Sequence, residues 1–165
     1  MASQVWQPAY IGLGSNLGDP TARLRAALDA IAALQGVTAL VVSPFYRTAP
    51  FGPVEQPDFV NAAAGVLTTL DPETLHAALK DLELRLGRRP PRERWGPREI
   101  DLDLLVHGAA RRDTPVLSLP HPGIPQRDFV LYPLRDIAPD LLVPGLGRVH
   151  GLAARVEDRG ATRLG

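Results

Sequence analysis

The sequence predicts an α+β fold in which helices cover an antiparallel β-sheet. Short apolar runs, several of them rich in β-branched residues, are typical of strands. Between them, leucines recur at three- and four-residue spacing in two segments that each begin with an Asp-Pro pair, as in amphipathic helices. At 165 residues the chain fits a single domain spanning residues 1–165, because most domains contain about 100 to 150 residues.

The first part of the chain predicts a strand, a helix and a second strand. Ala9–Leu13 is short, apolar and β-prone, and the glycines of the overlapping motif GLGSNLG are expected to be turn residues. Asp19 is a candidate N-cap for a helix whose apolar residues recur until Gly36. Val37–Tyr46 is apolar and β-branched, and it predicts the second strand.

A third strand, a second helix and a fourth strand follow. Phe59–Leu70 predicts a strand, Asp71 is the candidate N-cap of a helix that ends at Gly87, and Ile100–Val106 predicts another strand. The proline-rich segments before these two strands are expected to be long loops. Shorter elements are expected at Val116–Leu119, about Gln126–Ile137 and Leu152–Val156. This order of strands and helices is that of a ferredoxin-like arrangement.

The composition excludes several classes of protein. Eighteen basic residues balance eighteen acidic ones, so the broad positive field of a nucleic-acid-binding or membrane-surface protein is missing. The chain has no cysteine, which excludes disulfides and thiolate metal sites. No apolar run reaches the roughly 18 residues that span a bilayer. We therefore expect a cytoplasmic protein with neither a nucleic-acid nor a membrane partner. We also expect a monomer, although the composition does not decide the oligomeric state.

The stretch RWGPREIDLDLL, Arg94–Leu105, places Asp101 and Asp103 in a run that otherwise resembles a buried strand. Because side chains alternate along a strand, both carboxylates face one side. The side chains that face the other side are Ile100, Leu102, Leu104 and Val106. Like charges on neighbouring positions of one face repel. A bound divalent cation would explain the pair, and the solvated face of an edge strand is the alternative.

Five arginines precede these acids in the sequence. They are Arg88, Arg89, Arg92, Arg94 and Arg98. The guanidinium group suits bidentate contact with phosphate oxygens, and carboxylates for a metal beside arginines for phosphate are typical of phosphoryl transfer. The alternative is that the arginines pair with the aspartates and with surface acids, and the spacing alone does not separate the two interpretations.

Four ordered blocks of the sequence resemble one known family. They are AYIGLGSNLGD, SPFYRTAPFGPVEQPDFVNAA, RWGPREIDLDLL and LPHPGIPQRDFVLYPLRDIAPD. The chain resembles the 6-hydroxymethyl-7,8-dihydropterin pyrophosphokinases of folate biosynthesis from about Tyr10 to Pro144. The resemblance implies transfer of pyrophosphate from ATP to the hydroxymethyl group of the pterin, release of AMP, and two Mg²⁺ ions as cofactors. Both substrates are small molecules.

The resemblance also implies roles for individual residues. The acids that match Asp101 and Asp103 hold both metal ions, and the catalytic set further includes Arg88 and Arg98. The implied pterin site comprises Thr48, Ala49, Phe51, Phe59, Asn61, Trp95, Asp101 and Phe129. The implied ATP site comprises Glu83, Arg88, Trp95, Arg98, Leu104, Ser118, His121 and Arg127.

Two positions depart from the family's pattern. Relatives often have tyrosine where Phe59 stands, and many have arginine where Pro90 stands. Either Arg89 or Arg92 replaces the missing arginine, or that phosphate contact is absent. Two other functions remain as alternatives to pyrophosphate transfer. A metal-dependent phosphatase would also need paired acids and arginines. The second alternative is a ferredoxin-like module that binds a ligand without turnover.

We expect the two proline-rich loops, Gly87–Arg98 and Pro50–Pro57, to form a lid that ATP closes over the site and that excludes water. Limited proteolysis should cut both segments in the free protein and spare them when a non-hydrolysable ATP analogue and Mg²⁺ are present. Equal cleavage under both conditions would contradict the lid.

Overall fold

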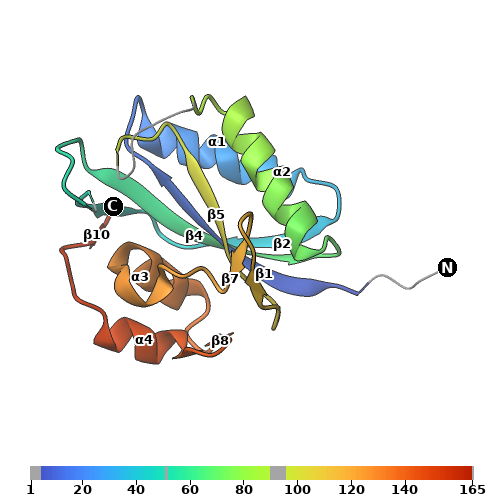
Figure 1. Ribbon diagram of the computed structural model, residues 1–165. Coiled ribbons are helices and arrows are strands. Elements are labelled where there is room, and N and C mark those ends of the chain that lie inside the picture. The colour runs from blue at the N-terminus through green and yellow to red at the C-terminus, as the bar shows by residue number, and fades with distance from the viewer. Residues whose placement is uncertain (1–4, 51, 90–95, 165) are drawn as a thin grey trace.

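The computed structural model describes residues 5–50, 52–89 and 96–164, and it confirms the expected α+β architecture (Figure 1). A central antiparallel sheet lies between two layers of helices, with α1 and α2 on one face and α3 and α4 on the other. The elements in chain order are β1 (Gln7–Ser15), α1 (Pro20–Ala32), β2 (Val37–Val42), β3 (Tyr46–Thr48), β4 (Phe59–Thr68), α2 (Pro72–Arg85), β5 (Asp101–His107), β6 (Arg112–Asp113), β7 (Ser118–Leu119), the 3₁₀ helix η1 (Ile124–Gln126), α3 (Asp128–Ile137), β8 (Leu142–Val143), β9 (Gly147–Arg148), α4 (Val149–Arg155) and β10 (Thr162–Arg163).

The strands of the main sheet follow the order β10, β3, β4, β1, β5, and β2 pairs with β4 on the same side as β3. All of these pairs are antiparallel. The four long strands therefore lie in the order β5, β1, β4, β2, and α1 and α2 make the two crossovers. This is the ferredoxin-like topology that the sequence predicts.

Helices α1 and α2 begin where their sequence signals predict. Asp19 Oδ1 accepts a hydrogen bond from the backbone N–H of Ala22 at 3.1 Å, and Asp71 Oδ1 accepts one from Thr74 at 2.8 Å. In each helix the residue after the cap is a proline, which has no N–H to leave unpaired. The leucine stripes of both helices are buried against the sheet and form its first core.

The second core lies between the sheet and the helices α3 and α4. It includes Leu131 and Leu134 from α3, Val149 from α4, and Ala63 and Leu105 from the sheet. The helix expected from about Gln126 begins at Asp128 and is preceded by η1. Within the described residues, no helix combines the length and the apolar character needed to cross a bilayer.

Two predictions about the strands are wrong in detail. Val37–Tyr46 forms two strands, because Pro44 offers no N–H to the ladder. Ser43 still contacts β4 at this break, since its backbone N–H donates to Ala63 O and its hydroxyl accepts from Ala63 N, both at 2.9 Å. The alternation in β5 ends at Leu105, where the register with β1 shifts. Val106 therefore packs in the second core with Leu105.

The C-terminal segment joins two parts of the fold, which the sequence did not predict. Strand β10 pairs with β3. Beside it, the Tyr46 hydroxyl donates a hydrogen bond to Asp136 of α3, and Arg163 donates to both Asp136 Oδ1 at 2.6 Å and the Tyr46 oxygen at 3.1 Å. Through these contacts α3 is held against β3.

We expect Tyr46→Phe to lower the free energy of unfolding by about 1 to 3 kcal/mol, because it removes a donor from a largely buried carboxylate and keeps the ring. Urea denaturation measures this change. Tyr132→Phe is the matched control: no hydrogen bond of its hydroxyl is found among the described residues, and it should change the stability by less than about 0.5 kcal/mol. Equal stability of the Tyr46 variant and the wild type would contradict the role of this contact.

Candidate active site

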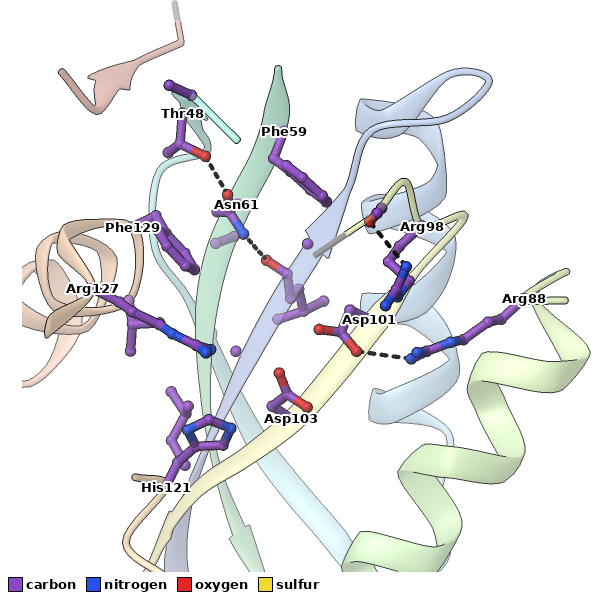
Figure 2. Close-up of a pocket in the computed structure, with 18 residues that line it drawn as sticks. Thr48, Phe59, Asn61, Arg88, Arg98, Asp101, Asp103, His121, Arg127 and Phe129 are labelled. Atoms are coloured by element: carbon purple, nitrogen blue, oxygen red, sulfur yellow. Dashed lines mark hydrogen bonds and ion pairs between the residues drawn. The ribbon is translucent and has the colours of Figure 1, made fainter. Parts of the chain in front are cut away.

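A cavity of about 320 Å³ opens on the face of the sheet that α3 covers, at the end of β1 and the beginnings of β4 and β5 (Figure 2). Residues from four strands, from α3 and from the loops beside them line it. These residues include Gly12, Gly14, Thr48, Ala49, Phe59, Asn61, Arg88, Arg98, Asp101, Asp103, His121, Arg127 and Phe129. Aromatic, basic and acidic side chains therefore meet around one space.

The floor of this cavity is formed by two glycines of the central strand. Gly14 pairs with Asn61 on one side and Asp101 on the other, and Gly12 pairs with Asp103 on β5. A Cβ atom at Gly14 would lie 2.6 Å from Asn61 Nδ2. The expectation that these glycines are turn residues is therefore wrong, since both lie within β1 and leave room above it.

One side of the cavity combines two aromatic rings with a fixed amide. Phe59 and Phe129 lie on either side of Asn61 (Figure 2). The Asn61 side chain accepts a hydrogen bond from Thr48 Oγ1 at 2.6 Å and donates one to Leu13 O at 3.3 Å. Its orientation is thus set by the protein, and one donor and one acceptor site remain for a ligand. This part of the cavity suits a flat ring with a polar edge.

Asp101 and Asp103 project side by side from β5 into the cavity (Figure 2). Arg88 Nη1 lies 2.8 Å from Asp101 Oδ1, and Lys80 Nζ lies 3.3 Å from Asp103 Oδ1. Burial raises the pKa of Asp101, and the charge of Asp103 raises it further, although the two cations lower it. Positive charge from a bound ligand would relieve the repulsion that remains between the two carboxylates.

The carboxylate pair fits a divalent cation with incomplete protein ligation. Carboxylate oxygens are the ligands that magnesium prefers, and magnesium commonly takes one or two of them together with phosphate oxygens and water. The described residues contain no group of three histidine, cysteine, aspartate or glutamate side chains that would enclose a metal. A cation held by Asp101 and Asp103 would therefore keep open positions for a substrate.

Basic and neutral donors face these acids across the cavity. The pKa of His121 is lowered to about 4 by burial and by the charge of Arg127, so the imidazole is neutral at pH 7. Its Nδ1 accepts a hydrogen bond from Gly123 N at 3.0 Å, which leaves the proton on Nε2. His121 thus offers an N–H donor, and Arg127 a guanidinium, to an anion in the cavity.

Ser15 and Asn16, which follow Gly14 in the chain, join the two loops that flank the cavity. The Ser15 hydroxyl donates to Glu99 O at 2.6 Å. Asn16 Nδ2 donates to Pro57 O, and Asn16 Oδ1 accepts from Arg98 N, both at 2.9 Å. Ser15 and Asn16 therefore connect the loop before β4 with the loop before β5, a role that we did not predict from the sequence.

The structure brings most of the predicted site residues together. All of the predicted pterin-site residues that are described line the cavity, as do Arg88, Arg98, Asp103, His121 and Arg127. Glu83, Leu104 and Ser118 are not among the lining residues: Glu83 lies beneath the site, Leu104 packs in the first core and Ser118 lies in β7. Their roles stay predictions. Phe51, Pro90, Arg92 and Trp95 lie outside the described residues.

Comparison with known proteins identifies the family. The family model for 7,8-dihydro-6-hydroxymethylpterin-pyrophosphokinase (HPPK) matches residues 10–139. The chain belongs to this family. A relative from Pseudomonas aeruginosa, named 2-amino-4-hydroxy-6-hydroxymethyldihydropteridine pyrophosphokinase, is 44% identical over 158 residues, which cover 96% of this chain and 97% of the relative. A relative of the same name from Haemophilus influenzae is 40% identical, with 94% and 97% covered.

A solved structure supports the fold of this HPPK-family chain. The crystal structure of a Plasmodium falciparum HPPK-DHPS triple mutant with SDX-DHP matches 93% of the chain with a TM-score of 0.72. The chain spans only 44% of that longer polypeptide, and the sequences are 16% identical. At this identity the likeness concerns the fold alone, and it agrees with the ferredoxin-like sheet described above.

We expect His121 to titrate near pH 4 in the folded, metal-free protein, against about 6.5 in an unfolded chain. Between these values the unfolded chain binds more protons, so the stability that His121 contributes is lost as the pH falls from 6.5 towards 4. Histidine NMR measures the pKa, and urea denaturation at several pH values measures the stability. His121→Gln should flatten this dependence, whereas the control His150→Gln, at an exposed position, should keep it. A His121 resonance that titrates near 6.5 would contradict the burial argument.

Proposed function

We infer that this protein transfers the terminal pyrophosphate of ATP to the hydroxymethyl group of 6-hydroxymethyl-7,8-dihydropterin and releases AMP. The main support for this function is the identity of 44%, over nearly the whole of both chains, with a relative that is named for this activity. The cavity agrees with it chemically, because paired carboxylates, basic donors and an aromatic clamp with a polar amide surround one space. The protein is proposed to act as a monomer, because a single chain supplies all of these groups. It is proposed to act in the reducing cytoplasm, because the chain has no cysteine.

The pterin is proposed to bind between Phe59 and Phe129. A planar ring can stack on these side chains, while Asn61 uses its remaining donor and acceptor on the polar edge of the ring. Thr48 holds that amide in place, so its role is to orient Asn61. The hydroxymethyl group would then lie on the side of the cavity where Asp101 is found.

Asp101 and Asp103 are the proposed ligands of Mg²⁺, with two ions as the resemblance implies. When bound, magnesium neutralises charge on the phosphates and polarises the attacking hydroxyl oxygen. The carboxylates themselves orient the metal from one strand, and their mutual repulsion is relieved only when positive charge is present.

The triphosphate is proposed to bind to Arg88, Arg98, Arg127 and His121. The guanidinium groups carry fixed positive charge, since arginine stays protonated in proteins. His121 adds a neutral N–H donor. The backbone hydrogen bond from His121 N to Leu105 O at 2.9 Å fixes the histidine beside β5, and so beside the metal ligands.

One assay separates this function from a phosphatase and from a ligand-binding module. The protein is incubated with ATP, Mg²⁺ and the hydroxymethyl dihydropterin, and AMP is followed with and without the pterin. The proposed function requires AMP only when the pterin is present. Phosphate release without pterin would favour the phosphatase, and binding of the pterin without any turnover would favour the module.

We expect Asp101→Ala to lower the rate of pyrophosphate transfer by about 100-fold or more, because one ligand of the metal that stabilises the transition state is lost. Asp103→Ala should have an effect of the same order. The rate of AMP formation at saturating Mg²⁺ measures both, and circular dichroism verifies the fold. Asp113→Ala, on the exposed end of β6, is the matched control and should keep full activity. Normal turnover of the Asp101 variant would remove the metal site from the proposal.

A further inference from the structure

The two proposed metal-site acids belong to a network of alternating charges. It runs from Asp103 through Lys80, Glu83 and Arg88 to Asp101, with Glu83 at its centre. Lys80 Nζ lies 2.9 Å from Glu83 Oε2, and Arg88 Nη1 lies 3.0 Å from Glu83 Oε1. Each aspartate is therefore paired with one cation, and both cations are held by the same carboxylate.

Glu83 is a rigid centre for this network. It is only 4% exposed, and its Oε2 also accepts a hydrogen bond from the backbone N–H of Leu102 at 2.7 Å. Both of its oxygens are thus occupied by protein groups. Because Leu102 lies between Asp101 and Asp103 on β5, Glu83 ties helix α2 directly to the part of the strand that carries the acids.

Lys80, the single lysine of the chain, uses all three of its donors inside this network. Its ammonium group donates to Glu83 Oε2 and Leu102 O, each at 2.9 Å, and to Asp103 Oδ1 at 3.3 Å. Unlike Arg88, Lys80 is not among the residues that line the cavity. Its ammonium group is therefore directed at Glu83, Leu102 and Asp103.

A cation in this position has a predictable effect on metal binding. The ammonium group of Lys80 donates to two carboxylates and a carbonyl oxygen, and these contacts favour its charged form. Three carboxylates and two cations leave one net negative charge in the network. A single net negative charge attracts a free divalent cation only weakly, so the site gains much of its affinity for cations from a negatively charged ligand.

We propose that Lys80 is an internal counter-ion of Asp103, which weakens the binding of free divalent cations and makes the site depend on the negative charge of a bound triphosphate. This inference rests on the proposed function, because it assigns Lys80 a role at the metal site of that reaction. Lys80 acts through Asp103 and is a positioning residue, since its three hydrogen bonds go to Glu83, Leu102 and Asp103 and it is not among the residues that line the cavity. The metal-free protein gains stability from the same contact, which offsets the repulsion between the aspartates.

The test measures binding of Mn²⁺ alone, in the absence of nucleotide, by isothermal titration calorimetry on the full chain. Lys80→Gln removes the charge and keeps an amide that can still donate to Glu83 and Leu102. We expect it to bind Mn²⁺ about tenfold more tightly than the wild type. Lys80→Arg keeps the charge and should stay near the wild type. Arg85→Gln removes an exposed cation from the same helix, and it should leave Mn²⁺ binding unchanged.

A thermal melt gives a second readout that does not depend on activity. Metal-free Lys80→Gln should melt below the wild type, and saturating Mn²⁺ should raise its melting temperature by more than it raises that of the wild type. A role in folding alone would lower the melting temperature without tightening Mn²⁺ binding. Lys80→Met, which keeps the apolar stem, is measured in place of the glutamine variant if that variant does not fold.

The outcomes separate this inference from the proposed function. Mn²⁺ binding that is unchanged or weaker in the uncharged variants overturns the role of Lys80, while a wild type that binds Mn²⁺ with ATP leaves the proposed function in place. A wild type that binds no Mn²⁺ even with ATP overturns both. Tighter binding in the uncharged variants, together with wild-type affinity in Lys80→Arg and Arg85→Gln, supports the counter-ion.

Discussion

The repulsion between Asp101 and Asp103 is the constraint on which the rest of the site depends. Neighbouring carboxylates on one face of a strand are unfavourable at any depth, and burial makes them more so. The protein offsets this repulsion with Lys80 and Arg88, which share the buried carboxylate of Glu83. The network of Asp101, Asp103, Glu83, Lys80 and Arg88 keeps one net negative charge, for which a divalent cation with its triphosphate is the proposed partner.

The sheet makes this arrangement possible because β1 places two glycines, and so no side chains, at the base of the cavity. Gly12 and Gly14 of β1 carry no side chains between Asn61 on β4 and the acids on β5, so the aromatic and the charged halves of the cavity share one floor. Helix α3 closes the side wall with Phe129. Because the C-terminal segment holds α3 against β3 through Tyr46 and Asp136, residues far apart in the sequence define one space.

Much of this was predictable, for reasons that particular residues make plain. The N-caps Asp19 and Asp71 and the leucine stripes behind them place α1 and α2, because capping and helical periodicity act over a few residues. The alternation around Asp101 places both acids on one face in the same way. The break at Pro44 and the register shift at Leu105 were missed, since each arises from pairing with another strand.

The sequence by itself determined the local elements, the shared face of the two aspartates and the family, because these depend on residue types at short and regular spacing. Only the tertiary structure decided which distant groups meet those aspartates. Lys80 lies 23 positions from Asp103, yet their charged atoms are 3.3 Å apart because α2 crosses over β5. Coulombic interaction depends on distance in space, and the packing of the helix against the sheet sets that distance.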